Sequence, residues 1–148
     1  MAGIIVGVDG SHGAHRALDW AMREAAAYHA PLTVVAVHEV AASGWTGNPI
    51  ILPADEPELD KTRQAAGEAV AKAATGLGQT QPASVTVHAV NGFAAEELIN
   101  ASRDADLVVV GFRGTGGFAR RVLGSVSNKV VHHAQCPVVV VPDAGSKV

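Results

Sequence analysis

A glycine-rich segment near the carboxyl end of the chain has the residue types that can hold a phosphate group. It reads Gly111-Phe112-Arg113-Gly114, followed by nine residues and then Gly124-Ser125. Glycine lets backbone N–H groups approach an anion without an obstructing Cβ, and the free amides that open a helix favour negative charge. An apolar strand before the array and a helical pattern after it favour a phosphate site. The alternative is a glycine-rich connection that only tolerates unusual backbone angles.

Two side chains in this segment would add to such a site. Arg113 would supply positive charge, and Ser125 would supply a hydroxyl donor at the start of the helix. The sequence therefore predicts an anion site built mainly from backbone amides.

A carboxylate stands directly after the first apolar run of the chain. Asp9 follows Ile4-Ile5-Val6-Gly7-Val8 and precedes Gly10. In an open parallel sheet, ligands bind outside the carboxyl ends of the strands, so Asp9 could accept hydrogen bonds from a ribose hydroxyl or a base amino group. It could equally satisfy backbone amides at the start of the next helix. The residues leave both interpretations open.

Five short apolar runs alternate with helical patterns along the chain, and several runs are continuous, which is typical of strands covered on both faces of a parallel sheet. The runs are Ile4 to Val8, Leu32 to Val37, Val85 to Val90, Leu107 to Val110 and Val138 to Val141. The expected helices begin near Ser11, Glu58, Ala94 and Ser125, and Pro137 ends the last of them. This order predicts an α/β fold, an open doubly wound five-stranded parallel sheet with helices on both faces, formed as one domain over residues 1–148.

Two of the helical patterns give a specific inward face. Positions three and four apart lie on one side of a helix, so we expect that side to pack on the sheet. In the first helix these positions are Ala14, Ala17, Leu18, Ala21, Met22 and Ala25. In the last helix they are Val126, Val130, Val131 and Ala134.

Charge and hydropathy exclude several classes of partner. The net charge is −3 and the Lys and Arg residues are scattered, so we expect no nucleic-acid partner. No apolar run is long enough to cross a bilayer and the amino terminus does not resemble a signal peptide, so we expect no membrane partner and a cytoplasmic location. The single Cys136 agrees with a reducing compartment, and we interpret it as a small buried apolar residue.

The signatures of several catalytic and metal sites are missing. There is no G-x-x-x-x-G-K-[ST] phosphate loop and no G-x-S-x-G nucleophile motif. His12 and His15 could share a helix face, but no third ligand stands at a suitable spacing. We therefore assign no catalytic residue and no metal ligand from the sequence.

Taken together, the opening run with Asp9, the G-x2-G-x9-G-[ST] array and the closing Cys136-Pro137 with its valine strand resemble the universal stress protein family, in its single-domain ATP-binding form found in actinobacteria. Val37-His38 and the run Asp106 to Gly111 match as well, so the resemblance covers nearly the whole chain. It implies a sheet with strand order 3-2-1-4-5 and a homodimer formed through Val138–Val141. An exposed apolar edge strand at that place is independently unfavourable.

The resemblance also implies where an adenine nucleotide binds. Adenosine would lie near Asp9 and Glu39, and the phosphates would lie over the glycine array and the start of the last helix. The implied binding residues are Val8, Asp9, Glu39, Val110, Gly111, Arg113, Gly114, Gly124, Ser125, Val126 and Ser127. One position departs from the family, because Glu39 stands where ATP-binding relatives usually carry an apolar residue. A carboxylate that faced phosphate there would lower the affinity.

From these observations we predict a protein that binds ATP, with Mg²⁺ held through the phosphates, and that acts in a stress response by changing its conformation or its partner interface. Catalysis is not required for that role, and at most a slow ATPase is expected. Three alternatives remain: a weak ATPase, a cyclic AMP receptor, and an interaction module without a nucleotide. An intact glycine array disfavours the last of these.

Overall fold

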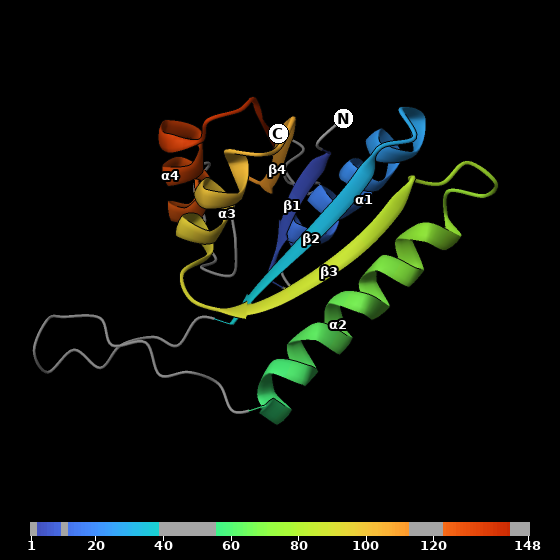
Figure 1. The fold of residues 1–148 in the computed structure, drawn as a ribbon, viewed down its shortest axis with the longest axis horizontal. Coiled ribbons are helices and arrows are strands. Elements are labelled where there is room, and N and C mark those ends of the chain that lie inside the picture. Colours follow the sequence, from blue (N-terminus) through green and yellow to red (C-terminus); the bar gives the residue numbers. More distant parts are fainter. Residues whose placement is uncertain (1–2, 10–11, 39–55, 113–122, 143–148) are drawn as a thin grey trace, which may run out of the picture.

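The computed structural model describes residues 3–9, 12–38, 56–112 and 123–142 of the chain. Strands and helices alternate along the described chain (Figure 1). The elements are β1 (Ile4–Val8), α1 (His12–Ala27), β2 (Pro31–His38), α2 (Glu56–Thr75), β3 (Ser84–Asn91), α3 (Ala94–Ser102), β4 (Leu107–Gly111), α4 (Ser125–His133) and β5 (Val138–Val141).

The five strands form one parallel sheet in the order β3-β2-β1-β4-β5. This confirms both the predicted α/β class and the strand order 3-2-1-4-5. The order reverses between β1 and its neighbours, since β2 lies on one side of β1 and β4 on the other. In an open α/β sheet a crevice opens at such a reversal, outside the carboxyl ends of the strands.

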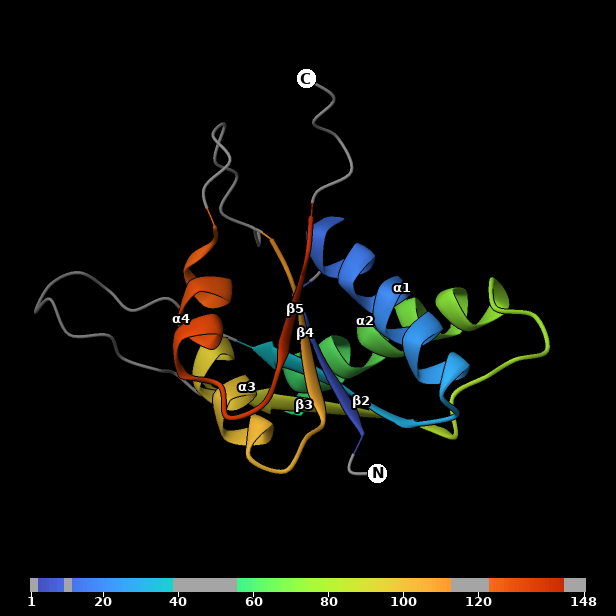
Figure 2. The same cartoon turned by 90° about the horizontal axis from the view of Figure 1, so that it is seen from above.

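The helices cover the two faces of the sheet in pairs (Figure 2). One core lies under α1 and α2 and is centred on fully buried residues such as Val6, Leu18 and Met22. The other lies under α3 and α4 and is centred on Leu98, Val108 and Val130. The carboxyl ends of the strands therefore lie between the helix layer of α1 and α2 and the helix layer of α3 and α4.

The first helix buries the face that its periodicity predicts. Every member of the predicted set on α1, from Ala14 to Ala25, is buried. On α4 the prediction was wrong at Val131, which is 47% exposed, whereas Val130 is fully buried. Adjacent residues can both be buried, as Ala17 and Leu18 are on α1, but α4 buries a narrower face that includes Ser127 and Val130. Consecutive helical residues point about 100° apart, and Val131 falls outside that face.

The second helix begins slightly earlier than its pattern predicts. It starts at Glu56 and not at Glu58, and it includes Pro57 in its first turn. Proline is compatible with that turn because its missing N–H has no partner within the helix there. None of the helices in the described part of the chain is long and apolar enough to cross a membrane.

Candidate functional site

A cleft opens at the carboxyl ends of β1, β2 and β4, on the face that α3 and α4 cover. Its free space, with the open mouth included, is about 460 Å³. The described residues that line it are Gly7, Val8, Asp9, Ala14, Val35, Val37, Ala94, Leu98, Val110, Gly111, Val126 and Ser127. We call it the nucleotide-side cleft, after the ligand that the sequence resemblance implies. It lies where the topology predicts a ligand crevice.

The cleft has an apolar wall and a polar end. Val35 and Val37 of β2, Leu98 of α3 and Val110 of β4 supply the wall. The other end holds the exposed Asp9 and the first turn of α4. Such a slot suits a flat apolar ring joined to a polar or charged group.

The first turn of α4 is fastened to the end of β4. Ser127 is buried, and its single hydroxyl proton is donated mainly to the carbonyl oxygen of Gly111 at 2.5 Å, with that of Phe112 also near at 3.3 Å. The backbone N–H of Gly124 donates to the carbonyl oxygen of Phe112 at 2.9 Å. The cleft thus borders a helix start that is held firmly in place.

The N-cap residue of α4 supplies no capping side chain. Gly124 is the N-cap residue, in an extended conformation with φ −63° and ψ 160°, and it has no side chain with which to bond the following amides. The opening amides of a helix have no partner within the helix and carry partial positive charge, so they favour an anion. Val126 and Ser127 bring this turn to the cleft.

Gly111 has a packing reason to be a glycine. A Cβ built on it would lie 2.7 Å from both the carbonyl carbon and the carbonyl oxygen of Gly13. The end of β4 and the start of α1 therefore approach so closely that no side chain fits between them. Gly7 makes a similar approach on the other face, where a Cβ would lie 2.8 Å from Cδ1 of Leu98.

Comparison with known proteins decides the family. The family model described as "Universal stress protein family" matches residues 2–142. The chain belongs to the universal stress protein family. A universal stress protein of Mycolicibacterium smegmatis is 38% identical over 139 residues, which are 94% of this chain and 47% of that protein. The chain thus spans about half the length of the curated relatives it matches.

Solved universal stress proteins share the fold. UspA from Lactobacillus plantarum is 26% identical and superposes with a TM-score of 0.73, covering 95% of this chain and 97% of that one. The universal stress protein from Archaeoglobus fulgidus in complex with dAMP is 25% identical, with a TM-score of 0.57 and coverage of 93% and 95%. The described strand order is therefore the arrangement expected for a universal stress protein.

The structure gathers six of the residues that the sequence proposes for the site. These are Val8, Asp9, Val110, Gly111, Val126 and Ser127, all of which line the nucleotide-side cleft. Gly124 and Ser125 stand at the adjoining helix start without lining it. Glu39, Arg113 and Gly114 lie outside the described residues.

Sequence reasoning missed the apolar wall of the cleft. Val35, Val37 and Leu98 were expected only as core residues, yet they line the cleft. One signal could have found two of them: alternate residues of a strand share a face, so Val35 and Val37 both point to the α3 side. Leu98 reaches the same place because Gly7 leaves room for it.

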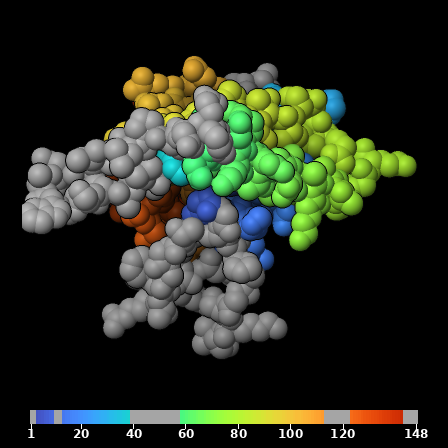
Figure 3. All heavy atoms as spheres, turned by 90° about the horizontal axis from the view of Figure 1, so that it is seen from below, coloured from blue at the N-terminus to red at the C-terminus, as the bar shows by residue number. Residues whose placement is uncertain are grey.

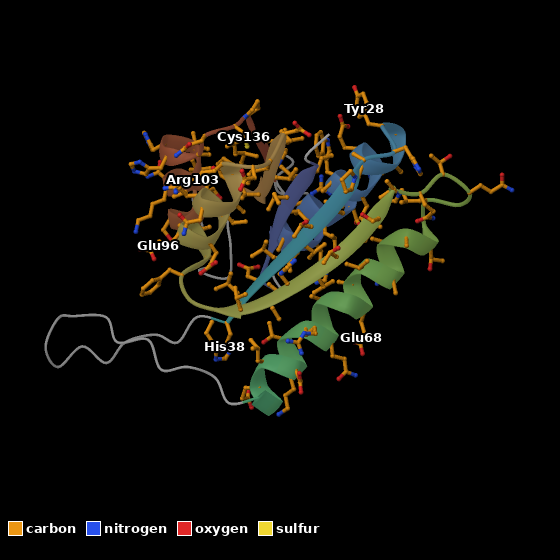
Figure 4. The ribbon with its side chains drawn as sticks, in the orientation of Figure 1. Tyr28, His38, Glu68, Glu96, Arg103 and Cys136 are labelled. Carbon is orange, nitrogen blue, oxygen red and sulfur yellow. The ribbon has the colours of Figure 1, made fainter. Side chains whose placement is uncertain are left out.

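The cysteine and the histidines whose side chains the structure describes form no recognisable metal site. Within the described ranges, no group of three or more His, Cys, Asp or Glu residues is arranged to hold a metal ion. Cys136 is half-buried against the core under α3 and α4 (Figure 4). Burial raises the pKa of its thiol, which reduces the thiolate fraction. Cys136 is therefore less buried than the sequence predicted, and its apolar contacts agree with a packing role.

Proposed function

We propose that this universal stress protein binds an adenine nucleotide in the nucleotide-side cleft and acts in a stress response through nucleotide-dependent conformation or partner binding. One observation carries the proposal: an apolar slot between β2, β4 and α3 opens onto the first turn of α4, whose N-cap glycine supplies no capping side chain. The complex of the Archaeoglobus fulgidus relative with dAMP supports the same ligand class.

The lining suggests how the nucleotide lies. We place the adenine ring against Val35, Val37 and Leu98, because a flat apolar ring gains most from that wall. Asp9 would accept hydrogen bonds from the ribose hydroxyls. The phosphates would then lie over the opening amides of α4, where the helix dipole favours negative charge.

We propose ATP as the ligand because a polyphosphate uses more backbone amides than a cyclic monophosphate does. We also expect Arg113 and Gly114 of the glycine array to contact the phosphates. Mg²⁺ would be held chiefly by the phosphates, since Asp9 is the only carboxylate among the described residues that line the nucleotide-side cleft. Binding alone suffices for a regulatory role, and we propose no catalytic residue. We also propose a cytoplasmic location.

Calorimetric titration of nucleotide-stripped protein tests this function, with ATP, dAMP and cyclic AMP titrated separately in the presence of Mg²⁺. We expect saturable binding of all three, tightest for ATP. Tighter binding of cyclic AMP would make the protein a receptor for that messenger and would contradict the ATP assignment. Binding of none of them would overturn the proposed function and leave an interaction module.

We also propose a homodimer formed through β5, the edge strand of the described sheet next to β4. The carbonyl oxygens of Pro137 and Val141 accept hydrogen bonds from N–H groups at the two ends of β4. Backbone groups alternate in direction along a strand, so those of Val138 and Val140 point to the outer edge. A second copy could pair there.

Val140→Pro should dissociate this dimer without breaking the ladder between β4 and β5. The substitution removes only an outward N–H, and proline is tolerated at such edge positions. Because the lost bond recurs in both copies, we expect the dimer dissociation constant to rise by about tenfold or more in sedimentation equilibrium. Val140→Thr keeps the N–H and should remain dimeric. A dimer of unchanged strength in the proline variant would exclude pairing through this edge.

A further inference from the structure

The strand at the β3 end of the sheet has an open edge. β3 covers eight residues, Ser84–Asn91, and within the described sheet it pairs only with β2. Figure 1 shows β3 as the outermost strand with α2 running along it. In Figure 3 the yellow-green of this part of the chain reaches the surface beside the green of α2. We call the outer side of Ser84–Asn91 the β3 edge.

The devices that usually block an edge strand are missing from β3. Proteins protect exposed edges with charged residues, prolines, β-bulges or very short strands. The segment Ser84–Asn91 contains no Asp, Glu, Lys, Arg or Pro. Its register with β2 runs residue for residue from Pro31 opposite Ser84 to His38 opposite Asn91, without a bulge. The β3 edge is therefore long and regular, which is the form that accepts an added strand.

Backbone groups in the middle of β3 point to this open edge. The N–H of Ala83 donates to the carbonyl oxygen of Ala30 at 3.0 Å, just before the strand begins. Backbone groups alternate in direction along a strand, so those of Val85 also point to β2, whereas those of Thr86 and His88 point outward. Each of these two residues presents one donor and one acceptor to an added strand.

The two faces of β3 differ in their chemistry. Val85 and Val87 are half-buried against the core under α1 and α2. Ser84, Thr86 and His88 point to the other face and are exposed, because α3 packs on β1, β2 and β4. Side chains of an added strand would therefore lie beside valines on one face and beside hydroxyl and imidazole groups on the other.

The side of α2 next to β3 is also apolar. Ala69 and Ala73 line the hollow between α2 and α1. Val70 and Ala74 lie about 100° further round the helix and belong to the same partly buried cluster as Val85, so they are on the side toward β3. A charged side chain placed there would lose water without gaining a partner, which is costly.

We propose that the β3 edge binds an extended segment of a partner protein as an added strand. The segment that fits is uncharged over about six residues, with β-branched apolar side chains toward α2 and hydroxyl side chains on the other face. A lone segment fits better than a second copy of this chain, because antiparallel pairing of two β3 strands would bring two α2 helices to the same face. The proposal requires neither a nucleotide nor the β5 dimer, since β5 lies at the opposite edge of the sheet.

The peptide acetyl-KTVTVTVK-amide is a matched probe, because its six central residues alternate threonine with valine and its terminal lysines keep it in solution. Amide hydrogen exchange measured by NMR reports where it binds. With the peptide at about ten times its dissociation constant, the amides of Thr86 and His88 should exchange about tenfold more slowly. The amide of Val85, which already points to β2, should change little. Absence of saturable binding, or protection only at other amides, would overturn the proposal.

Two variants at one position separate the backbone from the side chain. Thr86→Pro removes one outward N–H and leaves the ladder with β2 intact, since proline is tolerated at such edge positions. It should weaken peptide binding by about tenfold. Thr86→Val keeps the N–H and should bind the peptide within about twofold of the parent protein. Equal peptide affinities of the two variants would exclude strand addition at this edge.

The chemistry of the partner is tested with the parent protein. A peptide with glutamate in place of one central valine should bind about tenfold or more weakly, because that side chain would face α2. Equal binding of the two peptides would contradict an uncharged partner segment. Sedimentation of the protein alone tests the other occupant: an assembly that Thr86→Pro dissociates would assign the β3 edge to a second copy and overturn the partner segment.

Discussion

Gly111→Ala should lower the free energy of unfolding by about 2 to 3 kcal/mol, because the added methyl group overpacks a backbone contact that has no room for it. The new Cβ would lie 2.7 Å from the backbone of Gly13, and backbone atoms cannot rotate away as the end of a side chain can. For a domain of this size we expect Tm to fall by roughly 5 to 10 °C. Urea unfolding and calorimetry measure the two quantities.

The effect should spread to the nucleotide-side cleft. Gly13 lies in the first turn of α1, and Ala14, the next residue, lines the cleft together with Asp9. Relief of the clash would displace this turn from the end of β4. We therefore expect the variant to bind nucleotide more weakly as well as to unfold more easily.

Gly67→Ala provides the matched control, because it makes the same chemical change at a position with space. A Cβ on Gly67 would meet nothing within 4 Å, and the residue lies inside α2. Alanine there should raise the free energy of unfolding by about 0.5 to 1 kcal/mol. If both variants were as stable as the parent protein, the close approach of β4 to α1 would be excluded.

Much of the fold follows from periodicity alone. The valine-rich runs indicate buried parallel strands, and the small apolar residues from Ala14 to Ala25 indicate one packed helix face. Both features are local, so they can be read without knowing the tertiary structure. The misassigned Val131 marks the limit, because the width of the face that α4 buries depends on its tertiary neighbours and not on its own sequence.

The site was less predictable because its glycines serve different purposes. Gly111 touches Gly13, which is far away in the sequence, so its packing reason appears only when the two segments meet. The apolar wall could not be predicted from the sequence for a related reason. Val37 and Leu98 are apolar residue types that usually lie in a core, and only the topology shows that they lie beside the cleft.

The sharpest test of the phosphate position is Ser125→Asp, which should lower ATP affinity by about a hundredfold or more while leaving the fold intact. Ser125 is exposed and is the first residue of α4 after the N-cap Gly124. A carboxylate at a helix start stabilises the helix by about 0.3 to 1 kcal/mol. The same carboxylate would repel phosphates held over these amides, by several kcal/mol at about 4 Å. Stability and binding should therefore change in opposite directions.

Calorimetry with ATP and with adenosine distinguishes this repulsion from a blocked cleft. Adenosine has no phosphate, so its affinity for the Ser125→Asp variant should stay close to that for the parent protein. Ser125→Asn has nearly the same shape without the charge and should retain most of the ATP affinity. Loss of adenosine binding would mean that the side chain obstructs the apolar slot. Unchanged ATP binding would mean that the phosphates lie elsewhere, because a carboxylate and a polyphosphate cannot share one helix start without a large cost.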